Sequence, residues 1–228
     1  MIGLFDPLFW MLVGPPLVLG LIAQLWVKSA YASAQRYAAP LSGAAAARHI
    51  LNSAGLQNVD IEQVPGRLSD HYDPRHKVLR LSPQVYQSRT LAAVGIAAHE
   101  AGHAIQDARS YAPLVVRNLA VPAAGFGSGA GMWMLFFGLI LGYAPLAWVG
   151  IALFACFVFF QVVNLPVEFN ASSRAKAQLA ELGIVNDQEM KHVSAVLSAA
   201  AMTYVAATLQ AILTLLYYIM LFSGGSRD

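Results

Sequence analysis

Long apolar runs alternate with polar segments along the chain, and this alternation predicts a membrane protein. A membrane span needs about 20 consecutive apolar residues. The pattern predicts a first transmembrane helix at residues 4–27, a transmembrane hairpin at 119–165 and a last transmembrane helix at 199–222. The turn signal Gly142-Tyr143-Ala144-Pro145 divides the hairpin into two arms. A cleaved signal peptide is the alternative for the first run, but no basic residue precedes it and the run is long.

The polar segment at residues 28–117 predicts a small unit of helices and strands. An alanine-rich helix is expected between Ser42, which suits the N-cap position, and Gly55. Val59–Val64 and Lys77–Ser82 alternate apolar and polar residues, which is typical of strands. The polar stretch between these two strands is expected to be irregular.

The polar segment at residues 166–198 predicts two further helices. Pro166 suits the first helical position and Gly183 suits the position just past the last turn, so these residues enclose one helix. The second helix is expected to begin near Asn186 and to continue into the last apolar run.

Composition and charge agree with a membrane protein and predict its orientation. Hydrophobic residues make up 57% of the chain and charged residues 11%, whereas an average soluble chain carries about 25% charged residues. The net charge of +2 and the scattered basic residues argue against a nucleic-acid partner. All Lys and Arg residues except Arg227 lie within residues 28–117 or 174–191. The positive-inside rule therefore places both polar segments in the cytoplasm and both termini outside a plasma or inner membrane.

A metal-binding motif, His99-Glu100-Ala101-Gly102-His103, lies among helix-forming residues in a helix that Ser88 or Thr90 could cap. Residues four apart lie on the same face of an α-helix, so His99 and His103 can share one Zn²⁺. Glu100 would then lie beside the metal, where it can accept a proton from a metal-bound water. A helix with two hydrogen-bonded histidines and no metal is the alternative.

A catalytic zinc needs a third protein ligand. A metzincin would place a third histidine six residues after the motif, and this chain has Arg109 there, which excludes that class. The acidic residues after the hairpin on the predicted cytoplasmic side are Glu168, Glu181, Asp187 and Glu189. Glu168 differs from the others because it has apolar neighbours at the first turn of a predicted helix, where a carboxylate needs a partner such as a metal. Stabilisation of the helix N-terminus is the alternative role, and the pattern alone leaves both open.

The order of these motifs resembles a known family. The His99–His103 motif, a transmembrane hairpin and then Pro166–Ser172 are similar to membrane-bound neutral zinc metallopeptidases of the YugP type. These are gluzincins, related more loosely to the HtpX and CAAX-prenyl protease group. The resemblance covers nearly the whole chain and includes Gly66–Arg75 and Ala200–Ala206.

The resemblance implies a peptidase in which His99, His103 and Glu168 bind one Zn²⁺ and Glu100 is the catalytic base. It identifies no particular substrate. Members of the looser group commonly carry an aspartate four residues after the ligand glutamate, where it orients a ligand, and this chain has Ser172 at that position.

Several other residues are candidates for a substrate cleft. His71, Tyr72 and Tyr204 could stabilise an oxyanion, although a polar loop explains the first two and an interfacial aromatic explains Tyr204. Asp107 could orient a ligand imidazole, with surface solvation as the alternative. Val78–Leu81 could be an edge strand that pairs with an extended peptide substrate, or simply a packing strand.

These inferences predict a mainly α-helical integral membrane protein with about four transmembrane helices and a small cytoplasmic α+β zincin-like catalytic unit. The expected function is zinc-dependent cleavage of a peptide or membrane-protein substrate at the lipid bilayer, with Glu100 as general base. A non-catalytic metal-containing chaperone, adaptor or regulator of a protease assembly is the main alternative. A small transporter or channel is disfavoured because few ionisable residues lie within the predicted spans.

Overall fold

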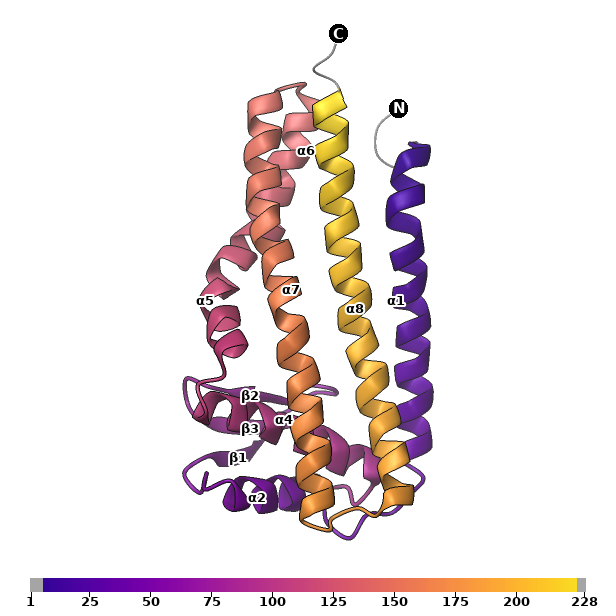
Figure 1. Cartoon of the computed structure of the whole chain (residues 1–228), viewed down its shortest axis with the longest axis vertical. Helices are drawn as coiled ribbons and strands as arrows, with labels where there is room; N and C mark the ends of the chain where they lie inside the picture. Colours follow the sequence, from indigo (N-terminus) through magenta and orange to yellow (C-terminus); the bar gives the residue numbers. More distant parts are fainter. Residues whose placement is uncertain (1–5, 225–228) are drawn as a thin grey trace. The chain divides into compact units, whose positions relative to one another are not determined.

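The computed structural model describes residues 6–224, which form two compact units (Figure 1). The helical unit comprises the chain up to Ala23, Val115–Pro166 and the chain from Met202 onwards. The α+β unit comprises Gln24–Leu114 and Val167–Ala201. Three long helices contribute residues to both units: α1 (Pro7–Ala34), α7 (Ala144–Glu181) and α8 (Asp187–Gly224).

Within residues 6–224, four helical segments are long and apolar enough to cross a membrane. They are α1, the segment Ala112–Ile140, α7 and α8. The second segment consists of α5 (Ala112–Phe126), a π-helical turn (Gly127–Gly131) and α6 (Met132–Ile140). Gly142, with a φ of +63°, lies in the turn between α6 and α7. The prediction of four spans, two of them joined as a hairpin, is therefore confirmed in helix length and composition.

Glycines bring the two arms of the hairpin into close contact within the helical unit. A Cβ atom on Gly150 of α7 would lie 2.6 Å from the backbone nitrogen of Leu135 on α6. A Cβ atom on Gly138 of α6 would lie 2.5 Å from the backbone nitrogen of Ala147 on α7. Lipid gives little hydrophobic drive for helix association, so close van der Waals contact between small residues has to hold such helices together.

The α+β unit places a small sheet and three shorter helices beside the ends of the long helices. Its own elements are α2 (Gly43–Ser53), β1 (Asp60–Gln63), β2 (His71–Asp73), β3 (Val78–Leu81), α3 (Pro83–Gln87) and α4 (Leu91–Ala108). The strand order is β1-β3-β2, with β1 parallel and β2 antiparallel to β3. Leu79 and Leu81 are fully buried in a core that is rich in alanine and leucine.

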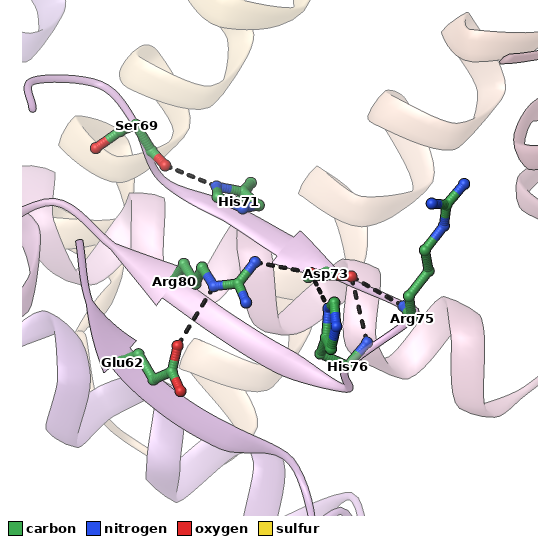
Figure 2. A network of polar contacts seen from close by, with 7 residues as sticks. All are labelled: Glu62, Ser69, His71, Asp73, Arg75, His76 and Arg80. Carbon is green, nitrogen blue, oxygen red and sulfur yellow. Dashed lines mark hydrogen bonds and ion pairs between the residues drawn. The ribbon is translucent and has the colours of Figure 1, made fainter. Parts of the chain in front are cut away.

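The opposite face of the sheet carries a charged network (Figure 2). Arg80 on the central strand β3 donates to Asp73 Oδ2 at 2.7 Å and to Glu62 Oε2 at 3.3 Å. His76 Nδ1 lies 2.7 Å from the same Asp73 oxygen. The hydrogen bonds from His76 and Arg80, together with backbone donors, hold the pKa of Asp73 well below its usual range. Arg80 therefore joins β1 and β2 to β3 through ion pairs, on the face of the sheet opposite the apolar core.

The helix starts follow the predicted capping residues. Ser42 Oγ accepts a hydrogen bond from Ala45 N at the start of α2. Thr90 Oγ1 does the same for Ala93 N at the start of α4, so Thr90 and not Ser88 is the cap. Asn186 precedes α8 as predicted, and its side chain accepts from the second and third helical residues.

One prediction about the sheet was wrong, and the structure decides between two alternatives for another segment. The polar stretch between the predicted strands contains β2, because backbone pairing with β3 organises residues that carry little apolar alternation. Val78–Leu81 is consequently the central strand and not an edge strand, since it pairs with β1 on one side and with β2 on the other. Its backbone is therefore not available to pair with a substrate, and β2 lies at the edge instead.

The prediction of a separate helix beginning at Pro166 was also wrong. Pro166 lies inside the continuous helix α7, so Glu168 is not in a first helical turn. Proline removes one backbone donor, which apolar spans tolerate where neighbouring side chains supply hydrogen bonds. Thr208 Oγ1 on α8 also donates to the Gln161 carbonyl at 3.2 Å, five residues before the proline. Stabilisation of a helix N-terminus is therefore no longer an explanation for Glu168.

The glycine contact between α6 and α7 predicts an unequal response to alanine. Gly150→Ala places a Cβ atom against backbone, which cannot move as a side chain can, and should destabilise the protein by about 1–3 kcal/mol. Gly125→Ala on α5 is the matched control, because its Cβ would meet nothing within 4 Å. Thermal unfolding in detergent should show a lower midpoint for Gly150→Ala and an unchanged or higher midpoint for Gly125→Ala. Equal midpoints would contradict close helix packing at Gly150.

Candidate metal centre

Helix α4 places the two histidines of the motif on one face. They are separated by one helical turn, and their ring centroids lie 4.8 Å apart with the rings nearly perpendicular at 85°. Most residues of α4 are alanine, glycine or aliphatic and are buried, so this helix crosses the interior of the α+β unit. The motif therefore lies on a rigid, buried element and not in a loop.

A glycine allows α7 to approach the motif. A Cβ atom on Gly102 would lie 2.6 Å from the carbonyl oxygen of Ala171 on α7. This contact lies one turn from Glu168, which is buried with 6% exposure. The carboxylate from α7 thereby reaches the histidine pair on α4, although 69 residues separate His99 from Glu168.

The three candidate ligands converge closely enough to hold one metal ion. Glu168 Oε2 lies 3.2 Å from His99 Nε2 and 3.8 Å from His103 Nε2. One donor atom from each of the three residues lies within 4.8 Å of the others. Tetrahedral zinc with bonds of about 2.0–2.1 Å separates its ligand atoms by about 3.3 Å. Two imidazoles and one carboxylate at these separations fit a catalytic zinc site, which leaves a fourth position for water.

The other nitrogen of each imidazole has a partner that fixes the ring. His99 Nδ1 lies 3.1 Å from Ser172 Oγ, and His103 Nδ1 lies 3.0 Å from Gln106 Oε1. An amide oxygen only accepts, so His103 carries its proton on Nδ1 and presents the Nε2 lone pair to a metal. Ser172 therefore lies against the imidazole of a candidate metal ligand.

Gln106 is a residue of the candidate site that the sequence analysis missed. It is fully buried, and its Nε2 donates to the Val167 carbonyl at 2.8 Å and to Asn170 Oδ1 at 3.0 Å. These bonds fix which way its amide oxygen points. A polar residue three positions after His103, on a helix otherwise filled with small apolar residues, was the available signal.

Glu100 lies beside the three ligands and is held by the sheet. Its Oε2 accepts a hydrogen bond from the backbone nitrogen of Tyr72 on β2 at 3.1 Å. Burial raises the pKa of Glu100 to about 7, while the charge of His99 acts in the opposite direction. A carboxyl group with this pKa can both accept and release a proton near neutral pH.

The electrostatics of the site favour a cation. Burial alone would lower the pKa of His99, but its hydrogen bond to Glu168 and the charges of Glu100 and Glu168 raise it above the usual value. Two carboxylates beside one imidazole therefore stabilise positive charge at this position, and a divalent metal would supply such charge.

The remaining candidates have varied surroundings. Tyr72 donates its hydroxyl to Asp107 Oδ2 at 2.9 Å, and burial together with this bond raises its pKa, so the hydroxyl stays protonated. Asp107 thus contacts Tyr72, and no hydrogen bond joins it to either motif imidazole in the described part of the chain. His71 is exposed, with its Nδ1 2.8 Å from the Ser69 carbonyl (Figure 2). Tyr204 belongs to the helical unit, and its proposed role remains a prediction.

Comparisons with known proteins agree with this site. The model of a family described as "Putative neutral zinc metallopeptidase" matches residues 9–223. This chain belongs to that family. It is also 44% identical over 223 residues to the "Putative membrane protease YugP" of Bacillus subtilis (strain 168), covering 97% of this chain and 99% of that protein. No solved structure matches the chain significantly. The family and the four apolar helices of the described residues together support a membrane-associated member of a putative zinc metallopeptidase family.

The hydrogen bond from His103 Nδ1 to Gln106 Oε1 predicts an effect on metal affinity. Gln106→Leu keeps the side chain buried but removes the acceptor for His103 Nδ1, and should weaken zinc binding by about 10–100-fold. Competition with a fluorescent chelator would measure this affinity. Gln188→Leu is the control, because Gln188 is exposed near the start of α8. Equal zinc affinity in the two variants would show that Gln106 does not orient His103.

Proposed function

We propose that the protein is a membrane-bound zinc endopeptidase of the gluzincin type. The observation that carries the proposal is the convergence of two imidazoles and one carboxylate from two helices, with a fourth residue, Glu100, beside them. Family membership supports peptide hydrolysis as the reaction class. The substrate is a peptide or membrane-protein segment that reaches the α+β unit.

His99, His103 and Glu168 hold the zinc ion. When bound, zinc supplies a Lewis acid for the scissile carbonyl and lowers the pKa of a bound water. Glu100 would accept the proton of the attacking water and pass it to the leaving amine. The backbone N–H of Tyr72 donates a hydrogen bond to Oε2 of Glu100, so Oε1 is the oxygen that exchanges the proton.

The surrounding residues keep this arrangement rigid. Ser172 and Gln106 hold the two imidazoles, and the Tyr72 backbone holds the general base. A non-catalytic metal-containing chaperone or adaptor would need the three ligands but no base with a pKa near 7 beside them. The environment of Glu100 therefore favours the enzyme over that alternative.

The orientation in the membrane is part of the proposal. Thirteen of the fourteen Lys and Arg residues lie in the two polar segments, and by the positive-inside rule this supports a cytoplasmic α+β unit with both termini outside. Cleavage would then act on cytoplasmic or membrane-derived segments.

Separate substitutions of the base and the third ligand should give different results. Glu100→Gln should retain zinc and lose at least about 100-fold in peptide hydrolysis, because the proton acceptor is gone. Glu168→Ala should lose both zinc and hydrolysis, because a ligand is gone. Metal analysis and cleavage of an unfolded protein such as casein would measure both properties. Asp187→Asn, which removes an exposed charge at the start of α8, should change neither. Full hydrolysis by Glu100→Gln would refute its role as base.

Reporter fusions test the orientation. An alkaline phosphatase that is active only outside the cytoplasm should be active when fused after Asp228 and inactive when inserted at Gly66 between β1 and β2. A cytoplasmic fluorescent reporter should give the reverse pattern. Active phosphatase at Gly66 together with inactive phosphatase after Asp228 would reverse the proposed orientation.

A further inference from the structure

A second polar site lies in the α+β unit, in a cavity of about 320 Å³ where the ends of α2, α4 and α7 meet. Among its lining residues are Ser53 of α2, Arg109 at the end of α4, and Arg174, Gln178 and Glu181 of α7. The volume is at the lower end of the range typical of small-molecule sites. The cavity is separate from the three candidate metal ligands, none of which lines it.

Two guanidinium groups line this cavity without a carboxylate partner. Within residues 6–224, neither Arg109 nor Arg174 forms an ion pair, although five other pairs are present. Glu181 also lines the cavity, but lies beyond ion-pair distance of both arginines and instead accepts a hydrogen bond from Gln178 at 3.1 Å. Two like charges beside one cavity repel each other, and an anion between them would turn that repulsion into attraction.

Arg174 is held in place before any ligand binds. Its Nε donates to Asn170 Oδ1 at 2.7 Å, and its guanidinium carbon lies 5.9 Å from the centre of the Tyr111 ring. A guanidinium has five N–H donors, and Nε uses only one of them. The two terminal nitrogens of Arg174 form no hydrogen bond within the described residues, so they remain available for two parallel bonds to an oxyanion.

The other polar side chains of the cavity already have partners. Ser53 Oγ donates to the Ile50 carbonyl or to Gln178 Oε1, and Gln178 Nε2 donates to Glu181. Apart from the Glu181 carboxylate, which accepts one hydrogen bond, the unused polar capacity is that of cationic donors. This set of donors favours a ligand with several acceptor oxygens and negative charge.

We propose that this cavity binds a phosphate group, held between Arg109 and Arg174. The phosphate comes either from a soluble phosphate ester or from the headgroup of an anionic lipid. The lipid source has support from the chain itself, because Arg109 precedes the apolar segment Ala112–Ile140 by three residues. Basic residues next to a membrane span are common binding sites for anionic headgroups.

Binding of glycerol 1-phosphate to the full-length zinc-loaded protein in neutral-lipid nanodiscs, measured by calorimetry, tests a soluble source. A parallel experiment compares binding of phosphatidylglycerol with that of phosphatidylcholine by native mass spectrometry, which tests a lipid source. Arg109→Gln and Arg174→Gln should each weaken binding of the effective ligand at least tenfold. Arg174→Lys should give an intermediate loss, because lysine keeps the charge and lacks the planar pair of donors.

Lys176→Gln is the matched control, since it removes one positive charge from α7 two residues away without lining the cavity. It should bind as the wild type does. Zinc content of each variant checks that the α+β unit is folded, and Arg109→Gln is the safer variant because the Arg109 side chain makes no hydrogen bond within residues 6–224. The proposal fails if the wild type binds neither ligand, or if Lys176→Gln weakens binding as much as the arginine variants. Binding of one ligand and not the other identifies the source of the phosphate.

Discussion

The contact between Gly102 on α4 and the Ala171 carbonyl on α7 is the constraint on which the metal centre depends. Any side chain at position 102 would meet this backbone oxygen at 2.6 Å and push the two helices apart. Helix axes can approach this closely only where a small residue faces backbone. The two separations that involve Glu168, 3.2 Å and 3.8 Å, are close to the ligand-atom separation of a tetrahedral zinc site, so a shift of α7 would remove Glu168 from the histidines. The motif prescribes no residue type at position 102, but this contact restricts the position to glycine as strictly as the metal restricts the histidines.

The interior of the α+β unit is unusual in holding several polar groups among alanine and leucine side chains. A buried polar group without a partner costs about 1–3 kcal/mol, and a buried charge costs more. Here Gln106, Ser172 and Glu100 each contact a specific partner: His103, His99 and the Tyr72 backbone respectively. Removing any one of these groups would therefore leave its partner without this hydrogen bond. Because each member depends on another, the arrangement of the ligands is fixed before a metal ion binds.

The apolar spans, the capping residues of α2 and α4, and the metal-ligand candidates could be predicted from the sequence, because each of these depends on local pattern or spacing. The sequence was insufficient where the outcome depended on distant neighbours. Strand β2 forms because β3 pairs with it, and α7 continues through Pro166 because a membrane helix can accommodate the missing donor. Gln106 was missed for the same reason: its role depends on Asn170 and the Val167 carbonyl, which come from another helix. Tertiary contacts, and not local propensity, decided each of these cases.

A continuous set of hydrogen bonds joins the two charged sites of the α+β unit. Asn170 Oδ1 accepts from Arg174 Nε and from Gln106 Nε2, and Gln106 Oε1 lies against His103 Nδ1. One end of this chain is a group of carboxylates and imidazoles that favours a cation, and the other end is a pair of arginines that favours an anion. If Arg174 shifted to meet a ligand, Asn170 would have to change its bonds to both Arg174 and Gln106. Thermodynamic linkage then requires any effect of the anion on zinc affinity to be matched by an equal effect of zinc on anion affinity. The same residues that contact His103 thus provide a physical route between a phosphate group at the end of α4 and the candidate metal centre.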